Sequence, residues 1–453
     1  MERPVPRVLL AGTNSGCGKT TVTCAILQAL ADQGLAISSC KCGPDYIDPM
    51  FHSRIIGARS TNLDPFFFDR DTLRCLLAQN ARGRDLTVVE GVMGYYDGIS
   101  AAEPRASTYQ VAQATETPVI LVVGTAGASL SVLAVIQGFL TLYPDNHIRG
   151  VILNRCSPAL YPALADAIRR RFGPAVEPLG YLPPMPACAL ESRHLGLVTA
   201  AEVTDLRRKL SLLSEQARKS LDLAGLRRLA ETAPPLPAPA PLHPAAGGRV
   251  RVAVARDNAF CFYYEDSLDV LRELGAELVD FSPLSDPGLP EDVQGLYLGG
   301  GYPELYVREL SENAAMRRSI RRALSAGLPC IAECGGFMYL TEHISGVPMV
   351  GFLPGGCRDA GRLVRFGYVT LTARRDNLLC RAGESIRGHE FHRWDADSPG
   401  DGFTARREDQ RSWPCAVTGP RLYAGFPHFH FRANPAFAWN FYHACLEEKT
   451  RHD

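Results

Sequence analysis

The stretch Gly12-Thr-Asn-Ser-Gly-Cys-Gly-Lys-Thr-Thr21 decides the fold of the first half of the chain. It follows a short apolar run at residues 8–11 and opens a segment at 20–33 whose apolar residues recur at helical spacing. A glycine-rich loop between a strand and a helix directs backbone N–H groups and the helix N-terminus at an anion. The sequence therefore predicts a phosphate-binding loop within an α/β domain.

The loop residues that we expect to bind a nucleotide are Gly16, Gly18, Lys19, Thr20 and Thr21. Gly16 and Gly18 allow phosphates to approach the backbone closely. Lys19 would reach the β- and γ-phosphates of ATP, and the Thr20 hydroxyl would hold Mg²⁺. The strict pattern G-x-x-x-x-G-K-[ST] has glycine at the position of Thr13, but the core of the motif and its strand–loop–helix context are intact.

Two acidic segments are candidates for the same site. Asp45 and Asp48 lie in a loop that contains glycine and proline, and Glu90 directly follows the apolar run 86–89. Ligands of open parallel sheets bind at the carboxyl ends of the strands, where the Glu90 carboxylate would hold Mg²⁺ directly or through water. Asp97 lies in a loop bounded by glycines, where a substrate could approach. For the three aspartates the alternative is a purely turn-forming role.

Both halves of the chain alternate apolar runs with amphipathic segments. The first half has further apolar runs at 86–89, 119–123 and 150–153. This pattern is typical of a doubly wound parallel sheet with helices on both faces. The Pro/Ala-rich stretch that follows has no periodic apolar residues, which is typical of a linker. The divisions that we expect are a phosphate-loop domain over 1–232, a linker over 233–249 and a second α/β domain over 250–453.

The second half repeats the alternation before its pattern changes. We expect strands at 250–255, 277–281, 295–298 and 329–332, and helices at 267–274 and 314–326. Beyond about residue 355 the periodicity loosens, and residues 365–372 favour an antiparallel strand. The second domain is therefore also expected to be α/β.

Composition and charge exclude several classes of protein. Of the 453 residues, 46% are hydrophobic and 21% are charged, and the formal net charge is zero. Such a chain is a globular protein of two or three domains, with no sign of a nucleic-acid footprint or a basic membrane surface. We expect no signal peptide, and no run of about 18 apolar residues predicts a transmembrane helix. The 14 cysteines include no C-x-x-C pair, which favours buried thiols in a reducing cytoplasm.

One cysteine stands apart from the others. Cys334 follows an apolar strand and precedes a helical segment, in the sequence Ile331-Ala-Glu-Cys-Gly-Gly-Phe337. A residue on a sharp strand-to-helix turn is exposed, has backbone N–H groups beside it and resembles the nucleophile elbow of hydrolases. We expect the helix N-terminus to lower the pKa of this thiol. Gly300, Gly301 and Gly335 are the candidates for an oxyanion hole.

A thiol nucleophile needs a base within hydrogen-bonding reach. The histidines available downstream are His389, His392, His428 and His430. His389 and His392 are one residue too close together for the H-E-x-x-H pattern of a zinc helix. The chemistry alone does not choose between His428 and His430.

The motifs together resemble the cobyrinic acid a,c-diamide synthase family, glutamine amidotransferases of cobalamin biosynthesis. The matching segments occur in family order: AGTNSGCGKTTV, KCGPDYIDPMFH, EGVMGYYDG, GVILNR, RHLGLV, YLGGGYPELY, ECGGFMYL, GHEFH and HFHFRANP. The resemblance implies a P-loop domain similar to dethiobiotin synthetase, followed by a domain similar to the class I, triad-type amidotransferases.

The resemblance also implies roles for individual residues. Cys334 would form a glutamyl thioester, and His428 matches the family's base. Most class I glutaminases carry glutamate two residues after that histidine, where this chain has His430, so the third member of the triad is not identified. In the first domain, Lys19, Thr20 and Glu90 match positions for ATP and Mg²⁺, with Asp45 as a further candidate metal ligand. The loops associated with the corrinoid and with the acyl phosphate match Asp45, Tyr46, Asp48 and Asp97.

The resemblance predicts ATP-dependent amidation of the a and c acetates of cobyrinic acid, with glutamine or ammonia as nitrogen source. Its substrates would be cobyrinic acid and glutamine, with no nucleic-acid or membrane partner. Relatives amidate the same positions of nickel-sirohydrochlorin, sirohaem-type rings or hydrogenobyrinic acid, and motifs separate these poorly. A distant alternative is a P-loop ATPase switch that makes no amides, which would need no thiol elbow. The sequence leaves the oligomeric state open, and it allows a homodimer.

Overall fold

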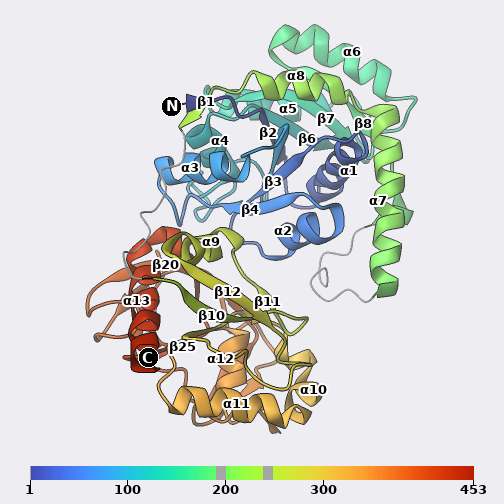
Figure 1. Ribbon diagram of the computed structural model, residues 1–453. Coiled ribbons are helices and arrows are strands. Elements are labelled where there is room, and N and C mark those ends of the chain that lie inside the picture. The colour runs from blue at the N-terminus through green and yellow to red at the C-terminus, as the bar shows by residue number, and fades with distance from the viewer. Residues whose placement is uncertain (1, 190–199, 238–247, 453) are drawn as a thin grey trace. The chain divides into compact units, whose positions relative to one another are not determined.

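The computed structural model describes residues 2–189, 200–237 and 248–452. The chain divides into two compact units, Met1–Ala240 and Pro241–Asp453 (Figure 1). The RHLGLV segment at 193–198 and most of the expected linker lie outside the described residues. The first unit extends past residue 232, where its expected boundary lay, because β9 (Leu236–Pro237) pairs antiparallel with β1 (Glu2–Arg3).

The first unit is built on a seven-stranded sheet in which every strand is parallel to its neighbours. In sheet order the strands are β4 (Arg59–Leu63), β3 (Ile37–Cys42), β5 (Leu86–Glu90), β2 (Arg7–Gly12), β6 (Val119–Gly124), β7 (Ile148–Asn154) and β8 (Glu177–Leu182). From β2 the chain runs to β3 and β4, returns to β5 between β3 and β2, and then continues through β6, β7 and β8 on the other side. The carboxyl ends of β2 and β5 therefore lie side by side at the centre of the sheet.

Helices cover both faces of this sheet, because right-handed crossovers to opposite sides place helices on opposite faces. The helices are α1 (Lys19–Asp32), α2 (Ile47–Phe51), α3 (Arg70–Asn80), α4 (Thr108–Thr115), α5 (Val132–Leu142), α6 (Tyr161–Phe172), α7 (Ala200–Ser220) and α8 (Leu223–Glu231), with a π-helical turn η1 at His52–Ile56. Helix α1 packs against α7, and α3 packs against α4 (Figure 1). This confirms the doubly wound sheet.

The second unit has a central six-stranded sheet. Its strands, in order, are β12 (Ala276–Phe281), β10 (Val250–Ala255), β13 (Gly295–Leu298), β15 (Cys330–Glu333), β25 (Leu422–Gly425) and β24 (Val417–Gly419). The first five are parallel, and only β24 is antiparallel to its neighbour. The helices of the unit are α9 (Glu265–Leu274), α10 (Val307–Glu312), α11 (Ala314–Ser325), α12 (Gly335–Leu340) and α13 (Pro435–His452).

Smaller sheets complete the second unit. An antiparallel five-stranded sheet contains β23 (Ser412–Cys415), β22 (Phe403–Arg406), β19 (Arg365–Ala373), β20 (Ser385–His392) and β26 (His428–Phe429). A four-stranded sheet contains β17 (Val347–Pro348), β16 (His343–Ile344), β18 (Gly356–Asp359) and β21 (Trp394–Ala396), and β11 (Phe260–Phe262) pairs with β14 (Gly300–Gly301). The antiparallel strand expected near 365–372 is β19, which confirms the change of pattern beyond residue 355.

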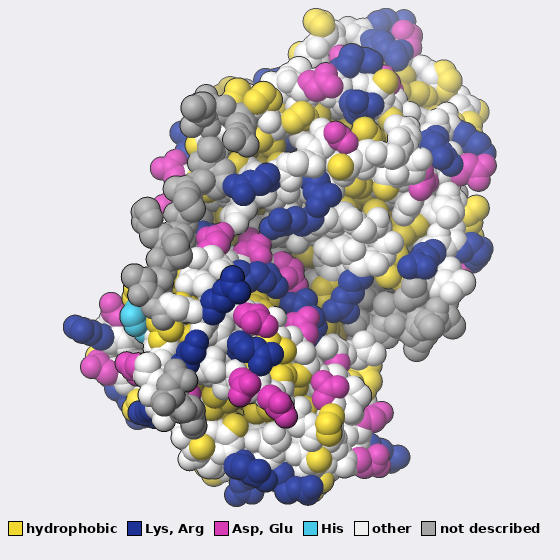
Figure 2. All heavy atoms as spheres, viewed as in Figure 1, with side chains coloured by type: hydrophobic (Ala, Val, Ile, Leu, Met, Phe, Trp, Pro, Cys, Tyr) yellow, Lys and Arg dark blue, Asp and Glu magenta, His cyan; other side chains and the backbone are white. Residues whose placement is uncertain are grey.

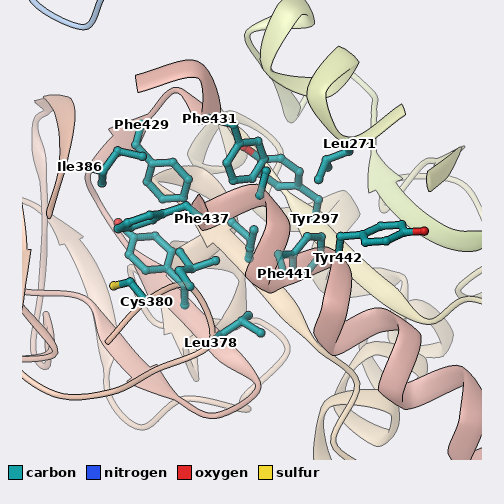
Figure 3. Close-up of a cluster of buried hydrophobic side chains, with 14 of the residues drawn as sticks. Leu271, Tyr297, Leu378, Cys380, Ile386, Phe429, Phe431, Phe437, Phe441 and Tyr442 are labelled. Carbon is teal, nitrogen blue, oxygen red and sulfur yellow. The ribbon is translucent and has the colours of Figure 1, made fainter. Parts of the chain in front are cut away.

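An aromatic core joins the central sheet of the second unit to its five-stranded sheet. Phe429, Phe431 and Phe437 pack on one another there, and Tyr297 reaches Phe431 from strand β13 (Figure 3). All four side chains are buried. The core thus fixes the chain that immediately follows His428.

The surface charges and the cysteines say little about where a functional site lies. Basic and acidic side chains are interspersed on the face shown in Figure 2. Over the described residues, no helix is both long and apolar enough to cross a membrane. All 14 cysteines are free, and each except Cys75 is buried.

Candidate active sites

The phosphate loop has the expected strand–loop–helix setting, between β2 and α1. Gly18 begins the helix with a φ of 96°, which favours glycine. Asn154, at the end of β7, braces the loop because its Nδ2 donates to the Cys17 carbonyl at 2.8 Å. A Cβ atom at Gly18 would lie 1.9 Å from that nitrogen. The close packing against Asn154 therefore requires glycine at this position.

Lys19 lies over the loop and is 8% exposed. Its Nζ donates to the carbonyl oxygens of Met93 and, at 3.3 Å, of Asn14. Burial lowers the pKa of Lys19. The chain after β5 lies against the loop as well, because the Tyr95 N–H donates to the Gly12 carbonyl at 2.8 Å. The structure therefore brings together the phosphate loop and the segment after β5, which the sequence assigned to one site.

Thr20 and Glu90 meet at the centre of the sheet. The Thr20 hydroxyl donates to Glu90 Oε1 at 2.7 Å, and Lys41 Nζ lies 2.9 Å from the same oxygen. Lys41 also pairs with Asp48 at 2.5 Å. Burial disfavours the charged forms of Asp48 and of Lys41. The Lys41 ammonium nevertheless lowers the pKa of Asp48, and the Glu90 and Asp48 carboxylates raise the pKa of Lys41. Burial lowers the pKa of His52 to about 4, so its contact with Glu90 Oε2 at 3.4 Å is made by a neutral ring.

The remaining predicted residues of this unit lie in adjoining turns. Asp45 Oδ1 accepts hydrogen bonds from the N–H groups of Ile47 at 2.8 Å and Asp48 at 3.3 Å. Burial and the nearby Asp48 raise the pKa of Asp45 to about 6. Asp97 Oδ2 accepts from the Gly94 N–H at 2.8 Å. Both aspartates thus form turns here, so their role towards substrate or metal stays a prediction.

Tyr46 and Asp48 are both buried, at 8% exposed each. Tyr46 directly precedes helix α2. Asp48 is connected to Glu90 through the Lys41 ammonium, which pairs with both carboxylates. This ion pair connects Asp48 to the phosphate-loop site.

Replacing Lys41 by methionine is expected to lower the free energy of unfolding by about 3–5 kcal/mol at pH 8, because Glu90 and Asp48 lose their buried counter-charge. Without Lys41 the folded-state pKa of these carboxylates lies above the unfolded value, so stability falls as pH rises past about 4.3. Thermal melts at pH 5.5 and pH 8 measure this. The exposed Lys219, which pairs with Glu215, provides the control Lys219→Met. If the Lys41→Met variant melts at the same temperature at pH 8 as at pH 5.5, the buried ion pair does not have the expected effect on stability.

The thiol of the second unit lies on a strained turn between β15 and α12. Cys334 has φ 49° and ψ −103°, an unusual conformation for a residue with a side chain. The expected elbow is therefore present. The expectation for its acidity is wrong: burial and the nearby Glu304 raise the pKa of the Cys334 thiol. Helix α12 has only six residues, and the side chain is 8% exposed, so desolvation outweighs the helix N-terminus.

The three glycines predicted to form an oxyanion hole lie beside the thiol turn. A Cβ atom at Gly335 would lie 3.1 Å from the Gly301 nitrogen. A Cβ atom at Gly300 would lie 2.5 Å from Cε1 of His428. The backbone of this strand end therefore has to be glycine for the His428 ring to approach it.

His428 contacts the residue immediately before the thiol turn. Its Nδ1 lies 3.1 Å from Oε2 of Glu333, the residue immediately before Cys334. His430 is also near Glu333, but its Nε2 pairs with Asp266 at 2.9 Å. His389 lies opposite His428 in the pairing of β20 with β26, and their rings stack at 6.1 Å. The geometry therefore favours His428 over His430 as the base.

Sequence reasoning missed three residues of these sites: Lys41, Asn154 and Glu333. All three lie within segments that carried the family resemblance. The signal that could have identified Lys41 is its position as a lysine within the buried strand β3. No sequence signal identified the partner of Glu333, because the contact joins residues 95 positions apart.

Comparisons with known proteins match both units. Residues 8–197 match a family model described as a CobQ/CobB/MinD/ParA nucleotide binding domain. Residues 251–436 match one described as a CobB/CobQ-like glutamine amidotransferase domain. Among solved structures, PurLQS from Thermotoga maritima matches 44% of this chain and 98% of its own, at 18% identity and a TM-score of 0.33.

Curated relatives match nearly the whole chain. Cobyrinate a,c-diamide synthase of Listeria innocua is 40% identical over 95% of this chain and 97% of its own. The proteins of that name from Thermoplasma volcanium and Priestia megaterium are 39% and 35% identical, and each match covers 99% of both chains. A glutamine amidotransferase domain joined to a nucleotide-binding domain makes the protein a glutamine-dependent carbon–nitrogen ligase. The chain belongs to the cobyrinate a,c-diamide synthase family.

Proposed function

We propose that this protein amidates the a and c acetate carboxylates of cobyrinic acid, with ATP and glutamine, in cobalamin biosynthesis. The observation that carries the proposal is the near-full-length match to relatives of that name. Two further observations support it: a phosphate loop with Lys19 over it, and a thiol elbow with His428 beside it.

The first unit would activate the carboxylate. A carboxylate is a poor electrophile, and transfer of the γ-phosphoryl group of ATP would give an acyl phosphate with a good leaving group. Lys19 would stabilise the charge on the transferring phosphoryl group. Asp45, Tyr46, Asp48 and Asp97 would act in the substrate and acyl-phosphate steps. The link from Asp48 through Lys41 to Glu90 supports a role beside the phosphates.

Thr20 and Glu90 fit a magnesium ion. A hydroxyl and a carboxylate 2.7 Å apart, next to the phosphate loop, are the hard oxygen donors that this ion takes beside nucleotide phosphates. Magnesium would neutralise phosphate charge there. Asp45 is the third proposed ligand. Its carboxylate now accepts bonds from its own turn and would have to leave them.

The second unit would release ammonia from glutamine. The Cys334 sulfur would attack the side-chain carbonyl carbon, and the N–H groups at Gly300, Gly301 and Gly335 would stabilise the oxyanion. Because burial raises the pKa of Cys334, we expect its proton to leave only as attack occurs, with His428 as acceptor. Burial lowers the pKa of His428 to about 3, which keeps the free ring neutral and able to accept.

Ammonia in bulk water at neutral pH is protonated and is not a nucleophile. Generating it within the protein and passing it to the acyl phosphate along a dry route would avoid this loss. We therefore infer that glutamine-derived nitrogen does not exchange with solvent before it is transferred. This inference rests on the chemistry of ammonia.

The test of the proposed function is the mass of the product formed from cobyrinic acid with ATP, Mg²⁺ and glutamine. We expect two mass steps, each converting one acid to one amide. Nickel-sirohydrochlorin, sirohaem-type rings and hydrogenobyrinic acid are assayed in parallel. Faster diamidation of one of these rings would refute cobyrinic acid as the substrate, and no amidation of any ring would refute the proposed reaction.

A further inference from the structure

The position two residues after His428 does not supply a carboxylate. It is His430, which is fully buried and donates from Nε2 to Asp266 Oδ1 at 2.9 Å. The next residue, Phe431, donates its N–H to Ser267 Oγ at 2.9 Å. These contacts attach the chain after β26 to helix α9. They leave open which group fixes the ring of His428.

Glu333 makes that contact from another part of the chain. Its Oε2 accepts a hydrogen bond from His428 Nδ1 at 3.1 Å, and its Oε1 accepts one from the Tyr297 hydroxyl at 2.9 Å. The side chain is buried, at 2% exposed for the residue. Both carboxylate oxygens are therefore engaged, and one of them holds the imidazole.

The fold explains why these groups meet. Glu333 is the last residue of β15, opposite Gly425 of β25, and His428 follows Gly425 by three residues. Tyr297 lies on the neighbouring strand β13, and its ring is held in the aromatic core of Figure 3. The sheet thus presents a fixed hydroxyl to one oxygen of Glu333 and the catalytic histidine to the other.

We propose that Glu333 is the positioning residue for His428, and replaces the glutamate that most class I glutaminases carry two residues after the histidine. The inference rests on the proposed roles of Cys334 and His428. A hydrogen bond from Nδ1–H to the carboxylate leaves the Nε2 lone pair free to accept the thiol proton. The carboxylate then stabilises the imidazolium that forms.

The reaction balances with these groups alone. The S–C bond to glutamine forms as the thiol proton moves to Nε2 of His428, and the C–N bond breaks as that proton moves to the leaving nitrogen, which departs as ammonia. Water then attacks the thioester, its proton passes through Nε2 to the Cys334 sulfur, and glutamate is released. Glu333 exchanges no proton with the substrate.

Glu333 must be ionised to hold the ring in this tautomer. Burial raises the pKa of Glu333 to about 8, and the hydrogen bond from Tyr297 opposes this rise. The titratable groups that face Glu333 are Tyr297, Tyr263, Tyr423, His428, His430 and Cys334. Glutaminase activity should therefore rise as pH passes through about 8.

The first test is Glu333→Gln, measured with glutamine and with ammonia as nitrogen source. We expect kcat with glutamine to fall by roughly 10²–10⁴-fold with KM little changed, by analogy with the loss of the orienting carboxylate of a serine protease. Amidation from ammonia should continue at the wild-type rate, which shows that the variant folds. The matched control is Asp266→Asn, made in another buried histidine–carboxylate pair of the second unit, and it should keep the wild-type kcat.

The second test is Tyr297→Phe, which keeps the ring and removes one hydrogen bond to Glu333. We expect the rising limb of the glutaminase pH profile to move upward by about one unit. A wild-type kcat in Glu333→Gln, or an unmoved limb in Tyr297→Phe, overturns the proposal. Cys334→Ala distinguishes a failure of this proposal from a failure of the proposed function. Glutamine-dependent activity in that variant would refute the glutaminase site itself.

Discussion

Cys334→Ala is expected to abolish amidation from glutamine, by at least about 10³-fold, while amidation from ammonia continues. The thiol is the nucleophile that forms the glutamyl thioester in the proposed glutaminase reaction, and a methyl group cannot attack the amide. Rates of product formation with each nitrogen source measure the effect.

Cys330→Ala is the matched control, because Cys330 is a fully buried thiol of strand β15, which directly precedes Cys334, and lies outside the site. It should keep both activities. Loss of the ammonia-dependent reaction in Cys334→Ala would show that the two units do not divide the chemistry as proposed.

Lys19→Met should remove amidation from both nitrogen sources, by about 10²–10³-fold in kcat, because it deletes a positive charge beside the transferring phosphoryl group. Methionine keeps the length of the stem and so limits the change in packing. The assay is amidation at saturating ATP, with glutamine and then with ammonia.

Lys219→Met is again the control, since Lys219 is exposed and pairs with Glu215 of the same helix, α7. The two substitutions should therefore differ in their response to ammonia. Cys334→Ala is rescued by ammonia, and Lys19→Met is not. A Lys19→Met enzyme that amidates at the wild-type rate would show that ATP activates the carboxylate without Lys19, at another site.

The sequence predicted the central strands of both units because these strands are continuous apolar runs. Strands β3 and β4 were missed, because their polar residues hide the pattern. Ser39 bonds to Ser60 at 2.8 Å, and Ser38 lies 2.9 Å from Thr87. Buried polar side chains of this kind are satisfied by neighbouring strands. Only the assembled sheet shows those partners.

The elbow at Cys334 and the glycines beside it were predicted from spacing alone, since strand, turn and helix follow one another in sequence. Its acidity was not, because desolvation depends on residues distant along the chain. For the same reason Glu333 was overlooked, although it is adjacent to Cys334: its role depends on where His428 lies. Local geometry could thus be predicted from the sequence, and electrostatic partners could not.

The most direct measurement of the coupled reaction is the nitrogen isotope in the product. Cobyrinic acid, ATP and Mg²⁺ are incubated with amide-¹⁵N glutamine and an equal concentration of unlabelled ammonium, and the product is analysed by mass spectrometry. Both new amides should carry ¹⁵N if the thiol unit supplies the nucleotide unit internally. Products whose nitrogen matches the bulk ammonium would contradict that coupling.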